Sequence, residues 1–149
     1  MNSQYTQLKV QKGIRQAEDD LVTWIEEALD RKKYKYGNLE ESQFRNLVRV
    51  ADTTESSQVI KNFLKYQVGR DSKWGRGKGS LAERIIEDID NNLKNKAENI
   101  AQDAEEKEIK PIHLELIRRY LGYGARCLKY LNSQEEQKHK NKHSGGKRD

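Results

Sequence analysis

The chain has 149 residues, of which 34% are hydrophobic and 36% are charged, against about 45 to 50% and about 25% in ordinary globular domains. So small an apolar complement can cover one stripe on each of several amphipathic helices, but it cannot fill both faces of a parallel sheet, which excludes doubly wound folds and large barrels. The formal net charge of +5 makes polyanions the first class of partner to consider.

Apolar residues recur at spacings of three and four along most of the chain, and its one proline interrupts little. The pattern predicts an all-α fold, a small bundle of about five helices. Residues 1–132 are expected to form a single domain with its core in residues 14–132, and residues 1–12 to be a loose lead-in.

Three helices are predicted in the first half of the chain. The first spans residues 14–33, the second spans residues 42–51, and the third begins near Val59 and ends at Gly69. Residues 69–80 follow, with four glycines and four basic residues. Their composition predicts a flexible basic loop.

A fourth helix is predicted to begin after Ser80, which forms a capping box with Glu83. Its apolar positions persist almost to Lys107, with a kink near Asn91 and Asn92. The helix carries many more acids than bases, which predicts a solvated face or a face toward a basic partner, not a nucleic-acid contact.

The last helix is predicted from Pro111, which suits a first helical turn, to Asn132. Its apolar positions step alternately by three and four and predict a seam against neighbouring helices: Leu114, Ile117, Leu121, Gly124, Leu128 and Leu131. Residues 133–149 contain no apolar side chain and are predicted to be a disordered basic tail.

None of the sequence motifs for nucleotide binding, metal binding or nucleophilic catalysis is complete. The run from Gly75 to Ser80 precedes a helix but lacks P-loop spacing and a preceding strand. His139 and His143 have no cysteine partners nearby, and Cys127 lies in mid-helix without a positioned base. We therefore expect a protein that is not an enzyme and uses no metal or cofactor.

Targeting signals are equally weak. The first ten residues contain no apolar segment of the kind that secretory signals use, and no apolar run approaches the about 18 residues of a membrane span. One cysteine cannot form an intramolecular disulfide. These features predict a cytoplasmic protein without membrane contact.

Clustered cations remain as the candidates for chemistry. Residues 61–80 hold six bases against one acid, and the last helix carries a basic arc opposite its seam. Such groups neutralise phosphates without reading sequence. From the faces of the predicted helices, we expect five residues to bind phosphates: Arg49, Lys61, Lys65, Arg118 and Arg126.

Three motifs follow one another in the chain: Ser42-Gln43-Phe44-Arg45-Asn46-Leu47, then Tyr66-Gln67-Val68-Gly69-Arg70 after an apolar helix, then a helix with Arg119-Tyr120 and Lys129-Tyr130. Together they resemble, over residues 14–132, the small α-helical subunit of Csm-type (type III) CRISPR interference complexes. The glycine-rich loop and the long acidic helix depart from that family's pattern.

The resemblance implies a non-catalytic helical bundle that stands in several copies beside the guide RNA and target RNA. It also implies contacts with the backbone subunits, with the large polymerase-like subunit and with other copies of the chain. The motif match offers as RNA-facing cations Arg45, Arg70, Arg119 and Lys129.

Two alternatives stay open. A helical DNA-binding regulator would need a compact helix-turn-helix and a dimer, whereas the polar segment at residues 52–57 predicts a longer connection and the third helix shows no series of base-reading side chains on its polar face. A protein–protein scaffold would use only the seam of the last helix, and its partner binding would be insensitive to salt.

Overall fold

The computed structural model describes residues 3–146, with side chains described as far as Lys140, and every regular element in this part of the chain is a helix. The elements are α1 (Ser3–Ala28), α2 (Glu41–Thr53), α3 (Ser57–Arg70), α4 (Leu81–Glu87), the π-helical turn η1 (Asp88–Asn92), α5 (Leu93–Ala104) and α6 (Lys110–Gly146). Because α4, η1 and α5 follow one another without a break, we count them as one long helix, and the described residues then form five helices. The predicted all-α bundle is confirmed.

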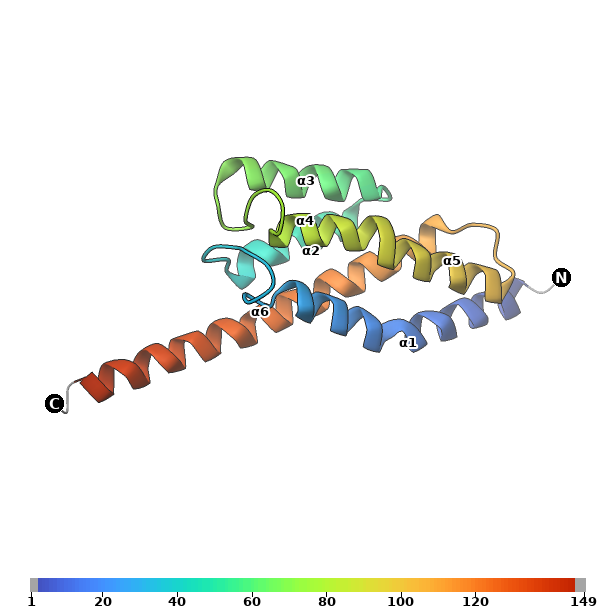
Figure 1. Ribbon diagram of the computed structural model, residues 1–149. Helices are drawn as coiled ribbons and strands as arrows, with labels where there is room; N and C mark the ends of the chain where they lie inside the picture. Colours follow the sequence, from blue (N-terminus) through green and yellow to red (C-terminus); the bar gives the residue numbers. More distant parts are fainter. Residues whose placement is uncertain (1–2, 147–149) are drawn as a thin grey trace.

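The centre of the bundle is α6, which packs against α1, α2 and α5 (Figure 1). Leu114, Ile117, Leu121 and Leu128 of its seam are buried, as the spacing predicts. The buried apolar side chains form one cluster to which all the helices contribute. In contrast, α3 lies at the edge of the bundle and packs on α2 and α4 (Figure 1).

Local capping explains where several helices begin. The hydroxyl of Ser56 accepts a hydrogen bond from the Val59 amide at 3.3 Å, and the Ser80 hydroxyl accepts one from the Glu83 amide at 3.2 Å. The predicted start of the fourth helix at Ser80 is thus confirmed. The irregularity predicted near Asn91 and Asn92 is the π-helical turn η1.

The bounds of the first and last helices differ from the prediction. The first helix begins at Ser3, so residues 3–12 are helical and not a loose lead-in, and it ends at Ala28, before the predicted Lys33. The last helix continues past Asn132 to Gly146, and residues 133–140 are rich in the helix formers Gln, Glu and Lys. Residues 147–149 of the predicted tail lie outside the described part.

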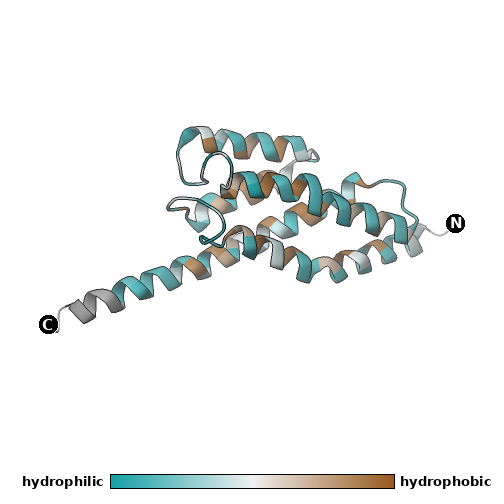
Figure 2. Ribbon diagram, viewed as in Figure 1, coloured by the Kyte–Doolittle hydropathy of each residue, from teal (hydrophilic) through white to brown (hydrophobic). Residues whose placement is uncertain are grey.

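Side chains of residues 133–140 are exposed, and Figure 2 shows this part of α6 leaving the bundle as a hydrophilic rod. The same view shows the hydrophobic residues concentrated where the helices face one another. The helical tail is therefore held by backbone hydrogen bonds, not by burial.

The loop before α4 is anchored, not free as predicted. Trp74 is only 1% exposed, and its ring centroid lies 5.2 Å from that of Phe44. The amide of Lys35 donates to the Gly79 carbonyl at 2.8 Å, and the Leu81 amide donates to the Lys35 carbonyl at 3.0 Å. The aromatic anchor holds the loop against the bundle and leaves Arg76 and Lys78 exposed.

Candidate nucleic-acid interface

Two of the predicted phosphate-binding cations have structural partners. Lys61 is 9% exposed, and its ammonium nitrogen lies 2.7 Å from a carboxylate oxygen of Asp90. Arg118 donates from Nε to the Ala51 carbonyl at 2.8 Å and from Nη2 to the Thr54 carbonyl at 3.0 Å. Arg118 therefore caps the C-terminal end of α2, where carbonyl groups lack helical partners.

Two more predicted cations sit in surface ion pairs. Arg119 donates to Glu115 at 2.7 Å and to Glu18 of α1 at 2.9 Å, and the hydrogen bond and charge of Glu115 raise the pKa of Arg119. Arg45 pairs with Glu41 one turn earlier on α2, with 3.0 Å between nitrogen and oxygen. Of these two arginines, Arg119 is the one that connects separate helices.

The other five predicted cations are exposed and make no ion pair with the described residues: Arg49, Lys65, Arg70, Arg126 and Lys129. They fall into separate groups. Arg49 is on α2, two are on α3, and two share one face of α6, where Gly122 leaves open space. The structure thus places the predicted site residues on more than one surface.

The group on α3 has the most favourable surroundings for an anion. Residues 57–70 contain no Asp or Glu, in a chain that has 24 of them, and three bases. The exposed residues of α3 recur at helical spacing and define what we call the outer face of α3: Gln58, Val59, Asn62, Lys65, Tyr66, Gly69 and Arg70.

Beside this stripe lies a shallow hollow of about 370 Å³ lined by Gln58, Val59, Lys61, Asn62 and Lys65. The exposed cations of the anchored loop, Arg76 and Lys78, follow α3 in the chain. The outer face of α3 therefore combines cations, amide groups and an exposed aromatic ring. The clustering of cations in the sequence does not point to Asn62 or Tyr66 as residues of this site. The run of residues without Asp or Glu, which contains both of them, can nevertheless be seen in the sequence.

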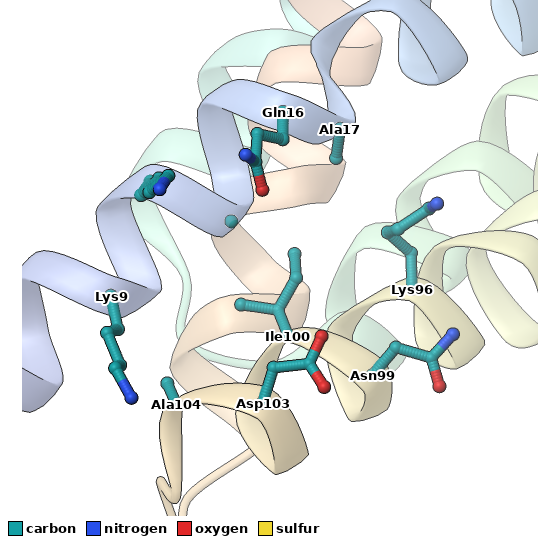
Figure 3. A pocket seen from close by; sticks show the side chains of 10 residues that line it. Lys9, Gln16, Ala17, Lys96, Asn99, Ile100, Asp103 and Ala104 are labelled. Atoms are coloured by element: carbon teal, nitrogen blue, oxygen red, sulfur yellow. The ribbon is translucent and has the colours of Figure 1, made fainter.

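A second basic groove, of about 560 Å³, lies between α1 and α5 (Figure 3). Lys9, Lys96 and Asp103 line it, and Figure 3 shows these side chains coming from both helices. Lys96 forms an ion pair of 2.9 Å with Asp20. Because carboxylates offset its lysines, this groove is a weaker anion site than the outer face of α3.

Inside the bundle, the acidic residue Asp88 is 1% exposed and lies at the start of η1. It accepts hydrogen bonds from Arg84 at 3.0 Å and from the hydroxyl of Tyr120 at 2.5 Å. Burial lowers the pKa of Arg84, but Asp88 and the hydrogen bond to Tyr34 together outweigh it, so the pKa of Arg84 is raised. Burial raises the pKa of Tyr120. Asp88 is therefore an exception to the predicted solvated acidic face, and it holds the helices together.

Other reactive groups are embedded. Burial raises the pKa of the Cys127 thiol to about 11, so little thiolate forms near neutral pH. Burial lowers the pKa of His113, whose Nε2 lies 2.7 Å from the Ile89 carbonyl. Within the described residues, no three His, Cys, Asp or Glu side chains are placed to hold a metal ion, and no helix is long and apolar enough to cross a bilayer.

Comparison of the chain with family models, with curated proteins and with solved structures gave no match.

Proposed function

We propose that this protein is the non-catalytic small subunit of a type III CRISPR interference ribonucleoprotein in the cytoplasm. In this role it binds the backbone of the guide and target RNA, contacts the backbone and polymerase-like subunits and further copies of itself, and stabilises the assembly. The observation that carries the proposal is the acid-free outer face of α3, because it includes Tyr66, Gly69 and Arg70 of the motif that resembles Csm-type small subunits.

The cations of this face suit contacts with phosphates. Lys65 and Arg70 are exposed on the outer face of α3, and Arg76 and Lys78 are exposed in the loop that follows it. Each phosphate that such a cation neutralises releases a counterion, so affinity should fall steeply as salt rises. The contacts carry no sequence information, which suits a subunit that accompanies any guide.

A second candidate function is a DNA-binding regulator. Only residues 54–56 separate α2 from α3, which is shorter than predicted and within the range of helix-turn-helix connections. The outer face of α3 also presents Gln58 and Asn62, two residue types that read base edges in a major groove. A footprint at one defined site on duplex DNA would favour this candidate over the RNA subunit.

The test compares two charge-reversed proteins with equal net charge. One carries Lys65→Glu and Arg70→Glu on α3, and the matched control carries Lys94→Glu on α5 and Lys107→Glu in the loop after it, both at exposed positions. Fluorescence anisotropy would measure the Kd for a labelled RNA between about 50 and 200 mM salt. We expect the α3 variant to bind at least about tenfold more weakly at low salt, with a shallower salt slope, because two phosphate contacts are lost.

Two outcomes would count against the proposal. Equal weakening in both variants would show that total charge matters and not α3, and absence of RNA binding by the wild-type chain at low salt would overturn RNA binding altogether. Co-purification with the backbone and polymerase-like subunits is the second measurement, and the α3 variant should assemble less stably than the control.

A further inference from the structure

Tyr66 is an unusual residue on the outer face of α3. It is 57% exposed, although a large aromatic side chain usually gains free energy by burial. Phe63 supports its ring from one turn earlier, with centroids 6.3 Å apart and planes inclined by 45°. The Arg70 guanidinium lies 5.7 Å from the ring centroid, within cation–π range. The ring is thus supported by its own helix while much of its surface stays open to solvent.

Other side chains on the outer face of α3 suit the base edge and the phosphates of a nucleotide. Asn62 lies one turn before Tyr66 and lines the hollow of about 370 Å³ together with Lys65. An amide can pair with a base edge, and an ammonium group can contact a phosphate. A side chain at Gly69 would meet nothing within 4 Å, so no bulky group covers the surface one turn later.

We propose that Tyr66 is a stacking platform for an unpaired nucleobase of a single-stranded nucleic acid. Arg70 and Lys65 contact the flanking phosphates, and Asn62 contacts the edge of the base. In a duplex both faces of each base are already covered by its neighbours, so only an unpaired base has a face to offer. The inference deepens the proposed function, on which it rests, by naming the nucleotide that this face receives.

The experiment uses the full chain and single-stranded oligonucleotides that contain 2-aminopurine, whose fluorescence falls when it stacks. The variants are Tyr66→Ala and Tyr66→Phe. Tyr5→Ala is the matched control, because Tyr5 is also 57% exposed and lies on α1. The Kd for the single strand and for the same sequence as a duplex is measured for each protein, together with the salt slope.

We expect Tyr66→Ala to bind the single strand about tenfold more weakly, to lose the quenching and to keep the wild-type salt slope, because a tyrosine releases no counterions. Tyr66→Phe should retain affinity and quenching, since stacking needs only the ring. Duplex binding should not change. Single-stranded DNA should show the same effect as RNA, because stacking does not involve the 2′-hydroxyl.

Wild-type affinity and quenching in Tyr66→Ala would overturn the inference. If Lys65→Glu with Arg70→Glu still weakened binding in that case, the proposed phosphate contacts would stand without the stacking site. Equal losses in Tyr66→Ala and Tyr5→Ala would also overturn it. A wild-type chain that binds no oligonucleotide would overturn both the inference and the proposed function.

Discussion

Gly122 and Gly124 of α6 are two residues apart and have opposite surroundings. A Cβ at Gly124 would lie 2.6 Å from Cζ of Phe44 and 2.8 Å from Cγ1 of Ile25, whereas a Cβ at Gly122 would meet nothing within 4 Å. The seam position predicted close packing at Gly124, and these contacts confirm it. Gly122 lies on the exposed arc, where a side chain has room.

The same substitution at these two positions should therefore have opposite effects. Gly124→Ala should lower the free energy of unfolding by about 1 to 3 kcal/mol, because the added methyl overpacks the contact between helices. Gly122→Ala should raise it by up to about 1 kcal/mol through helix propensity. Urea unfolding of both variants checks this, and equal shifts in the same direction would contradict the structure.

At the scale of the element, η1 shows how one irregular turn organises the bundle. A π-helical turn breaks the regular hydrogen-bond ladder, and at this turn the Ile89 carbonyl meets the Nε2 of His113 on α6 at 2.7 Å. Asp88, in the same turn, meets Tyr120 one helix away. The turn is therefore fastened to α6 by two buried polar contacts.

The burial of His113 predicts a dependence of stability on pH. Burial lowers the pKa of His113 below its ordinary value of 6.5, and Lys94 and Lys61 act in the same direction, whereas the hydrogen bond with the Ile89 carbonyl and the charge of Asp90 oppose them. The neutral imidazole is thus favoured in the folded state. Its contribution is fully present above about pH 6.5 and is lost as pH falls toward the folded-state pKa, by at most about 1.4 kcal/mol per pH unit.

His113→Gln removes this titration while keeping an N–H group for the Ile89 carbonyl. We expect the loss of unfolding free energy between about pH 7 and pH 5 to be smaller in this variant than in the wild-type chain. The control is His139→Gln on the exposed part of α6, which should keep the wild-type profile. Urea unfolding at several pH values gives the comparison, and a His113→Gln profile as steep as wild type would contradict the assignment.

For the whole molecule, the contrast lies between the packed bundle and the part of α6 that leaves it. Asn132 donates a hydrogen bond to the Leu39 carbonyl at 3.0 Å, and the side chains of residues 133–140 beyond it are exposed. The bundle and the rod of α6 should therefore contribute differently to stability and to anion binding.

Two truncations separate these contributions. A chain that ends at Gln134 should unfold within about 0.5 kcal/mol of the full chain, because the described side chains that it loses, at residues 135–140, are exposed. A chain that ends at Lys129 loses Leu131 and Asn132 and should be less stable by about 1 to 3 kcal/mol. Urea unfolding measures both, and equal destabilisation by the two truncations would show that the end of α6 belongs to the fold.

Spacings of three and four were enough to predict the helical class, the faces of the helices and the seam of α6, because they are local properties that one helix expresses alone. Lys65, offered by the helix faces, and Arg70, offered by the motif match, are both exposed on α3. The absence of apolar spacing hid the first turns of α1, which begins at Ser3, and the extension of α6 past Asn132.

Packing between the helices determines which cations remain available for a ligand. Arg118 meets the Ala51 carbonyl across 67 positions of sequence, and Arg84 meets the Tyr34 hydroxyl across 50. The same long-range packing buries Trp74 and holds the basic loop. In the sequence, a basic residue that faces solvent cannot be told from one that binds a carbonyl group. The carbonyl partner is brought to it by another helix and not by residues next to it in the chain.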